Sequence, residues 1–152
     1  MSLFPPFDEL DRAIAGWMEK YGHLFLRISL GLVFIWFGIL KLFGVSPAND
    51  LVARTVYWFS PEVFIPILGA WETAIGIGLL FRPLLRAALF LLFLQMPGTM
   101  LPLFLLPQIC FTHFPFAPTL EGQYIIKNLV LISAGIVVGG TVRHKRDQGK
   151  LE

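Results

Sequence analysis

One carboxylate, Glu72, stands at the middle of a long apolar segment, and this feature constrains the fold more than any other. The segment runs from Val63 to Phe81 and reads VFIPILGAWETAIGIGLLF. At about 1.5 Å per residue, roughly 20 apolar residues span the hydrocarbon core of a bilayer. A charged side chain at that depth costs about 2.5 kcal/mol or more, so it needs a partner or a function. The segment therefore predicts a transmembrane helix that carries a buried acid.

Composition and three further apolar segments extend this prediction to the whole chain. Of the 152 residues, 56% are hydrophobic and only 14% are charged, whereas a soluble domain has about 25% charged residues. The net charge of +2 gives no reason to expect a nucleic-acid partner. The predicted spans cover residues 26–43, 63–81, 84–106 and 124–142. Because lipid offers the backbone no hydrogen bonds, the sequence predicts an all-α, integral membrane four-helix bundle over residues 26–142.

The segments that flank the spans have characters of their own. In residues 1–25, apolar side chains recur at helical spacing among charges, at Leu10, Ile14, Trp17 and Met18. This pattern is typical of an amphipathic helix that lies in the membrane interface and then turns into the bilayer. The residues from Ser46-Pro47 onward predict a short helix in the outer loop. Loop 107–123 is rich in proline and aromatic residues, and no regular structure is assigned to it.

Basic residues fix the predicted orientation. They precede the first span, flank the turn between spans two and three, and fill the tail 143–152: Arg12, Lys20, Arg27, Arg82, Arg86, Arg143, Lys145, Arg146 and Lys150. If the chain crosses four times, all of these lie on one side, and Arg54 is the only basic residue in the opposite loops. The positive-inside rule then places both termini in the cytoplasm.

Polar side chains in the spans predict a cluster in the outer half of the bundle. Lys41 leans inward from the end of span one and Glu72 leans outward, because side chains tilt toward their helix N-terminus; the two could form an ion pair or a proton relay. Gln95 lies near the middle of span three, and Lys127 and Asn128 lie one turn into span four. A pocket with these groups could accept an anion, a quinone carbonyl or a lipid head group.

Plainer interpretations of the same residues stay open. Both lysines lie near span ends and could simply extend to the interface, Glu72 could form a purely structural pair, and the two amides could bridge helices. Small residues repeat at helical spacing and predict close helix packing, at Gly31, Gly38, Gly69, Gly76, Gly135 and Gly139. Cys110 and His113 give a CxxH spacing that supplies too few ligands, so no metal site is predicted.

Three segments of the chain are similar to the DoxX-like family. RISLG leading to FGILKLFG resembles the first helix of these proteins, WETAIGIGLLFRP resembles the second, and GQYIIKNLVLISAGIVVGG resembles the last. The resemblance implies a small four-helix protein of the prokaryotic inner membrane; a relative, DoxD, is the membrane subunit of a thiosulfate:quinone oxidoreductase. Positions that match the family are Arg27, Gly38, Lys41, Glu72, Gly76, Lys127 and Asn128. The single cysteine cannot supply the cysteine pair of a thiol oxidoreductase.

The leading hypothesis is a redox-associated membrane subunit whose pocket binds a quinone or a similar small molecule. Glu72 would be the catalytic group, and the ligand would be bound by Lys41, Lys127, Asn128 and Gln95. A quinone is the only cofactor that this hypothesis invokes. The expected partners are membrane lipids and a periplasmic or membrane redox protein, and several copies could assemble. The first alternative is a non-catalytic scaffold or assembly factor whose outer loops, Tyr57–Phe59 and Phe111–Phe116, hold a partner protein. The second is a transporter of a small solute or lipid.

Overall fold

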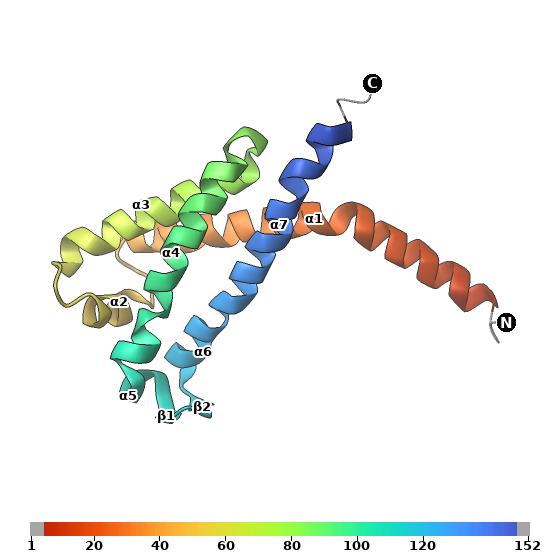
Figure 1. Ribbon diagram of the computed structural model, residues 1–152. Coiled ribbons are helices and arrows are strands. Elements are labelled where there is room, and N and C mark those ends of the chain that lie inside the picture. Colours follow the sequence, from red (N-terminus) through yellow and green to blue (C-terminus); the bar gives the residue numbers. More distant parts are fainter. Residues whose placement is uncertain (1–4, 149–152) are drawn as a thin grey trace.

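The apolar segments of the sequence all fold as helices. The structure, a computed structural model, describes residues 5–148, with side chains from Asp8 to Val142. Its long helices are α1 (Pro5–Leu42), α3 (Pro61–Leu80), α4 (Leu85–Leu105) and α7 (Asn128–Gln148) (Figure 1). The short elements between them are α2 (Asn49–Thr55), the 3-10 helix η1 (Arg82–Leu84), α5 (Pro107–Cys110), β1 (Phe111–His113), β2 (Ala117–Pro118) and α6 (Leu120–Ile126).

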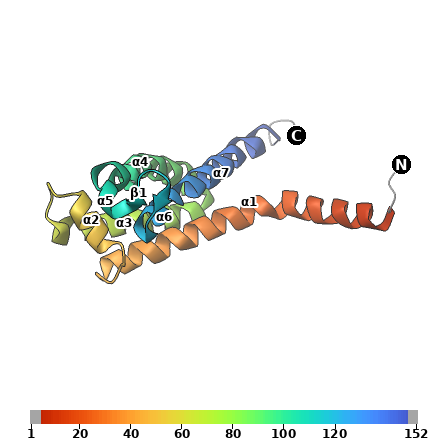
Figure 2. The ribbon, with the colours of Figure 1, turned by 90° about the horizontal axis from the view of Figure 1, so that it is seen from below.

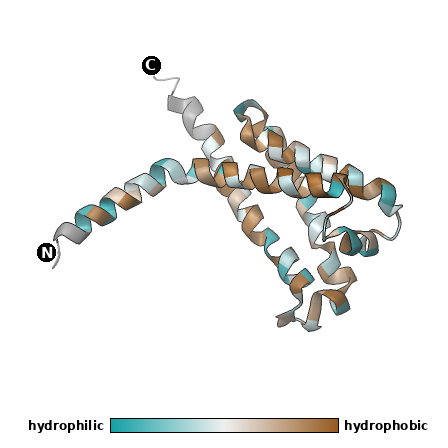
Figure 3. Cartoon of the chain, turned by 180° about the vertical axis from the view of Figure 1, so that it is seen from behind, coloured by the Kyte–Doolittle hydropathy of each residue, from teal (hydrophilic) through white to brown (hydrophobic). Residues whose placement is uncertain are grey.

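Within the described residues, four helical segments are long and apolar enough to cross a membrane. They cover Asp8–Leu42, Pro61–Leu80, Arg82–Leu105 and Leu120–Val142. Large apolar side chains remain exposed on the outside of the helices, as at Phe90 (66%), Phe104 (79%) and Val130 (68%). Figure 3 shows mainly hydrophobic residues on these helices within the bundle, whereas the N-terminal half of α1 mixes hydrophilic and hydrophobic residues. An apolar exterior of this kind suits lipid rather than water, which supports a multi-pass membrane protein.

The long helices pack as a closed ring. Helix α1 contacts α3, α3 contacts α4, α4 contacts α7, and α7 contacts α1 again. Buried side chains from all of these helices form one core near the turn between α3 and α4, and its members include Leu30, Leu79, Leu92 and Val138. The connections α2, α5 and α6 gather at the opposite end of the bundle (Figure 2). The bundle thus has a tightly filled end, called here the turn end, and an end covered by short elements, called here the loop end.

Helix α1 differs from the prediction that an interfacial helix in residues 1–25 turns before it enters the bilayer. One helix covers both the amphipathic segment from Pro5 and the first span, without a turn at residue 25. No proline lies between Pro6 and Pro47, so nothing removes a backbone hydrogen bond or blocks the helix. The side chains from Glu9 to Phe25 are exposed, and this half of α1 runs away from the bundle (Figures 1 and 2). Residues 1–4 lie outside the described range.

The connecting segments differ from the predicted boundaries. Helix α2 begins at Asn49 rather than at Pro47, and the Ser46 hydroxyl accepts a hydrogen bond from the backbone N–H of Ala48 at 3.3 Å. Loop 107–123 does contain regular structure: α5, the antiparallel pair β1–β2 and the start of α6. Helix α7 extends to Gln148, into the predicted tail 143–152; the last residues of that tail, 149–152, lie outside the described range.

The fourth span, Leu120–Val142, contains a one-residue interruption of the helix. Helix α6 ends at Ile126 and α7 begins at Asn128, with Lys127 between them. Thr119 caps α6, since its hydroxyl accepts a hydrogen bond from the N–H of Gly122 at 3.2 Å. The same hydroxyl donates to the carbonyl of Ile109 at 2.6 Å. This cap therefore fixes α6 to the end of α5 at the loop end of the bundle.

Candidate ligand-binding site

Glycines bring α1 and α3 into contact at backbone distance. A Cβ atom added to Gly69 would lie 2.7 Å from the carbonyl oxygen of Gly38, and one added to Gly76 would lie 2.6 Å from that of Gly31. Real Cβ atoms do not approach a carbonyl so closely, so these positions accept only glycine without a shift of the helices. A Cβ added to Gly135 or Gly139 would meet α4 side chains instead, at 3.3 Å from Phe93 and 3.5 Å from Leu89.

This contact places Lys41 against Glu72. The Nζ of Lys41 donates to Oε2 of Glu72 at 2.7 Å, and both side chains are buried, with exposed fractions of 4% and 7%. The end of α1 helps to fix the lysine, because Gly44 has a φ of 71° and lets the N–H of Val45 bond to the carbonyl of Leu40 at 3.0 Å. The predicted ion pair of Lys41 and Glu72 is therefore confirmed.

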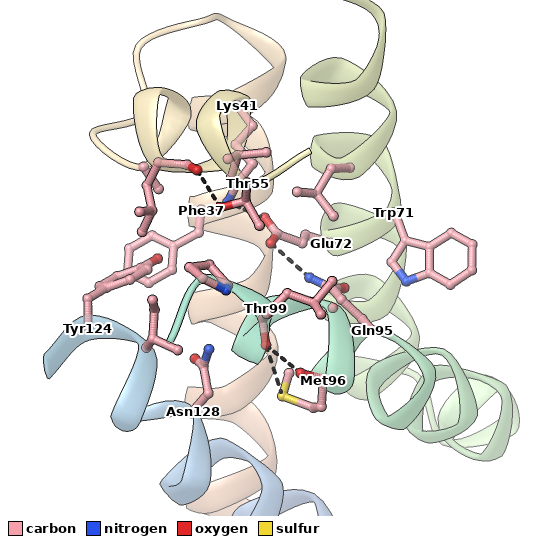
Figure 4. Close-up of a pocket in the computed structure, with 18 of the residues that line it drawn as sticks. Phe37, Lys41, Thr55, Trp71, Glu72, Gln95, Met96, Thr99, Tyr124 and Asn128 are labelled. Carbon is pink, nitrogen blue, oxygen red and sulfur yellow. Dashed lines mark hydrogen bonds and ion pairs between the residues drawn. The ribbon is translucent and has the colours of Figure 1, made fainter. Parts of the chain in front are cut away.

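Gln95 on α4 completes a three-residue cluster. Its Nε2 donates to the other carboxylate oxygen of Glu72, Oε1, at 2.9 Å. Gln95 is 9% exposed, so all three side chains of the cluster lie inside the bundle. Each carboxylate oxygen of Glu72 thus accepts a bond from a different neighbouring helix (Figure 4). The negative charge is satisfied without water, as a buried charge requires.

The cluster forms part of the wall of a large cavity in the loop end of the bundle. The cavity has a volume of about 880 Å³, and most of the side chains around it are aliphatic or aromatic. Pockets for small molecules commonly have about 300–1,000 Å³ and a similar mix of apolar walls and few polar groups. The walls come from α1, α2, α3, α4, α6 and α7. The arrangement can therefore enclose a mainly apolar molecule and present polar groups to one part of it.

Lys127 and Asn128 line the cavity but do not join the cluster. Asn128 is half-buried, Lys127 is exposed, and in the described part of the chain neither side chain hydrogen-bonds to Lys41, Glu72 or Gln95. All five polar residues of the predicted cluster therefore line this cavity, although only Lys41, Glu72 and Gln95 are hydrogen-bonded to one another. The charge of Lys41 is already balanced by Glu72, which leaves Lys127 as the basic group at the cavity wall.

Several side chains that the sequence did not single out also line the cavity. They are Phe37, Thr55, Trp71, Thr99 and Tyr124. The rings of Phe37 and Tyr124 lie 6.1 Å apart between centroids, and Figure 4 shows Tyr124 and Asn128 on the side of the cavity opposite Trp71. Only Tyr124 carried a signal, because it stands one helical turn before Asn128. The others resemble ordinary lipid-facing or core positions.

Two buried polar atoms of this wall have no partner among the described residues. They are Oε1 of Gln95, an acceptor, and Nε1 of Trp71, a donor. Buried polar atoms are almost always hydrogen-bonded in folded proteins. Each of these atoms therefore leaves one hydrogen bond available at a residue that lines the cavity.

Cys110 and His113 do not form a common site. The Cys110 side chain is fully buried, and its Sγ donates to the carbonyl of Pro102 at 3.4 Å, whereas His113 is exposed. Burial raises the pKa of the Cys110 thiol, and the negative charge of Glu121 raises it further. Among the residues that the structure describes, no three His, Cys, Asp or Glu side chains are grouped to hold a metal ion.

Comparison of the chain with protein-family models, with curated proteins and with solved structures finds no match.

Proposed function

We propose that this chain is a multi-pass protein of the prokaryotic inner membrane, of the DoxX-like kind, with both termini in the cytoplasm. The distribution of basic residues supports this orientation, since Arg82 and Arg86 lie at the turn end and the tail is basic. The loop end of the bundle then faces the periplasm. In that orientation, the cavity lies in the outer half of the membrane.

The ligand that suits the cavity best is a quinone or a molecule of similar shape and polarity. The volume of about 880 Å³ is enough for a substituted aromatic ring and part of an apolar tail. Phe37, Trp71 and Tyr124 offer flat faces against which such a ring can pack. The observation that carries the proposal is the position of the Lys41–Glu72–Gln95 cluster in the wall of this apolar space.

Glu72 is the proposed catalytic group. Reduction of a quinone to a quinol takes up two electrons and two protons. Glu72, once it has taken up a proton from solvent, could pass that proton to a ring oxygen and so return to its carboxylate form, and the second proton would also come from solvent. Lys41 would hold the carboxylate in place and balance its charge. The electrons would come from a redox partner protein in the membrane or periplasm, so this chain would act as the quinone-binding subunit of a larger oxidoreductase. Lys127 and Asn128 would contact the ligand from the opposite wall.

The test is binding of a short-tailed benzoquinone to the purified protein in detergent. We expect Glu72→Gln and Lys41→Met to weaken binding and to abolish quinone-linked turnover with the partner. Phe37→Leu removes only a ring from the cavity wall and should weaken binding while the ion pair stays intact. Lys20→Met, on the exposed half of α1, is the matched control and should bind like the parent. If the Glu72 and Lys41 variants both bind and turn over like the parent, the proposal is wrong.

A scaffold function is the second candidate, and one observation favours it. Aromatic side chains at the loop end are strongly exposed, including Tyr57 (78%), Phe114 (70%) and Phe116 (91%). Exposed aromatic groups of this kind could anchor a partner protein. Purification under mild detergent separates the two candidates. A stoichiometric partner without a bound small molecule, lost on substitution of Phe116 and Tyr57 by serine, would favour the scaffold.

A further inference from the structure

The orientation of the Gln95 amide is determined by its neighbour. Its Nε2 donates to Oε1 of Glu72 at 2.9 Å, and the reverse orientation would place the amide oxygen against a carboxylate oxygen, where both groups are acceptors. The amide nitrogen must therefore face Glu72, and Oε1 must face away from it. With 9% of the residue exposed and no partner at Oε1 among the described residues, the cavity wall presents a fixed, buried acceptor.

Trp71 supplies the complementary group. Its Nε1 is a donor that is buried and has no partner in the part of the chain that the structure describes. In the view of Figure 4, the nitrogen lies on the edge of the indole nearer to the Gln95 amide. The described residues contain no hydrogen bond between the two side chains. The wall thus presents one unpaired acceptor and one unpaired donor, and both residues line the cavity.

We infer that the ligand of this cavity places a hydroxyl group at Gln95 and Trp71, so that the quinol form binds in preference to the quinone. A hydroxyl can donate to Oε1 of Gln95 and accept from Nε1 of Trp71 at the same time. A quinone carbonyl can only accept, so it leaves the buried amide oxygen without a donor. This inference rests on the proposed function, and it names the redox state that the site selects.

Each carboxylate oxygen of Glu72 already accepts one bond, from Lys41 or from Gln95, whereas Oε1 of Gln95 accepts none among the described residues. The free acceptor that points elsewhere is the amide oxygen of Gln95, and an acceptor left unpaired in a buried wall is the strongest basis for discrimination between an OH group and its oxidised analogue. The preference expected from one such bond is roughly tenfold in the dissociation constant.

The experiment compares two ligand pairs in which one member carries a hydroxyl donor and the other does not. Equilibrium dialysis of the detergent-solubilised protein would measure binding of a short-tailed benzoquinol, kept reduced with dithionite, and of its benzoquinone. A redox-inert pair, 4-hexylphenol and 4-hexylanisole, repeats the comparison without a reductant. We expect the quinol and the phenol to bind roughly tenfold more tightly than their partners. Thermal unfolding of each variant would establish that it is folded.

Two variants assign the preference to these atoms. Gln95→Met keeps the length of the side chain and removes the Oε1 acceptor, together with the Nε2 that donates to Glu72. Trp71→Phe keeps a ring and removes only the donor, so it tests the hydroxyl while the Lys41–Glu72–Gln95 cluster stays intact. Both should reduce the preference for the hydroxyl compounds to about twofold or less, mainly through weaker binding of the quinol and phenol. Trp58→Phe is the matched control, because Trp58 is another indole that lines the cavity, and it should leave the preference unchanged.

Three other outcomes of these binding measurements would overturn the inference. If quinone and anisole bind as tightly as quinol and phenol, the inference is overturned, the quinone-binding proposal stands, and a water molecule is the simplest partner for Gln95 and Trp71. A preference that persists in both Gln95→Met and Trp71→Phe would place the hydroxyl elsewhere and also overturn the inference. If neither member of either pair binds, the proposed function fails together with it.

Discussion

The ammonium group of Lys41 and the carboxylate of Glu72 lie 2.7 Å apart, although 31 residues separate them in the chain. Both side chains are buried, and the contact depends on the glycine-mediated approach of α1 and α3. Gln95 reaches the same carboxylate from α4. The charge on Glu72 is therefore held by three helices at once, and it stands at the boundary between the filled turn end and the cavity.

Removal of one charge of the pair should destabilise the protein strongly. We expect Glu72→Gln or Lys41→Met alone to lower the free energy of unfolding by about 3–5 kcal/mol, because the remaining charge is buried without a counter-ion. The double substitution should cost less than the sum of the two single ones. Unfolding in mixed micelles with increasing SDS measures these values. Asp50→Asn, at an exposed position on α2, is the control and should have little effect; strictly additive single effects would contradict the prediction.

A methyl group at the contact of α1 and α3 should force the helices apart. Gly38→Ala and Gly69→Ala place a Cβ within 3.0 Å of backbone atoms of the facing helix, and overpacking of this kind costs about 1–3 kcal/mol. Gly16→Ala is the matched control, since nothing lies within 4 Å of its added Cβ. The control should stabilise α1 by up to about 1 kcal/mol, as alanine favours a helix over glycine. Equal effects at all three positions, in the same micelle titration, would refute the close contact.

Alkylation should report the environment of Cys110. Burial and the charge of Glu121 raise the pKa of the thiol, so little reactive thiolate exists at pH 8 and iodoacetamide should react slowly. The rate should keep rising with pH above the range in which an ordinary cysteine levels off. Glu121→Gln removes one cause, lowers the pKa and should raise the rate at pH 8. An exposed thiol from Thr112→Cys, in a Cys110→Ser background, is the reference; a Cys110 that reacts as fast as this reference contradicts the prediction.

The raised pKa also links Cys110 to stability. The pKa of this thiol is higher in the folded protein than in the unfolded chain. Below the pKa of the unfolded thiol, Cys110 therefore makes its full contribution to the free energy of unfolding, and this contribution is lost as the pH rises through the pKa of the folded thiol. The free energy of unfolding should therefore fall more steeply on the alkaline side in the parent than in Cys110→Ser. Chemical unfolding at a series of pH values from 7 to about 11 would measure the difference.

Fusion reporters test the proposed orientation. Green fluorescent protein at the C-terminus should fluoresce in cells, because the basic tail would keep it in the cytoplasm. Alkaline phosphatase inserted after Phe59, in the loop before α3, should be active, because this enzyme requires the periplasm. An insertion after Arg82 is the matched control and should be inactive. The opposite pattern would place the cavity in the inner half of the membrane.

The helices could be located from the sequence because the apolar segments are long, and in lipid the backbone of such a segment satisfies its hydrogen bonds by forming a helix. The Lys41–Glu72 pair could also be predicted, since helical repeat and side-chain tilt are properties of the local chain. The break at Lys127 was not foreseen, because no proline or glycine marks it. The hairpin β1–β2 depends on pairing between loop residues, and the continuity of α1 depends on the absence of a helix breaker. A hydropathy pattern reports neither of these properties.

The cavity could be predicted only in part. Polar residues are rare within apolar spans, and for this reason Glu72 and Gln95 could be predicted as residues of the site. Trp71 and Phe37 are residue types that also occur at lipid-facing positions. Their place in the cavity wall follows from the rotation of each helix about its own axis, which the sequence does not specify. The free oxygen of Gln95 follows from the bond between its Nε2 and Glu72 on α3, and that bond forms only when α3 and α4 pack together.

The shared carboxylate has a consequence for biosynthesis. The ribosome delivers Lys41 before Glu72, and at about 5–20 residues per second the 31-residue separation corresponds to an interval of about 2–6 s. During that interval the amine must remain in the translocation channel or near the lipid surface, because its counter-charge has not yet been made. A nascent chain that stalls after the first helix would thus expose an unneutralised lysine, and that lysine would distinguish an unfinished copy from a complete one.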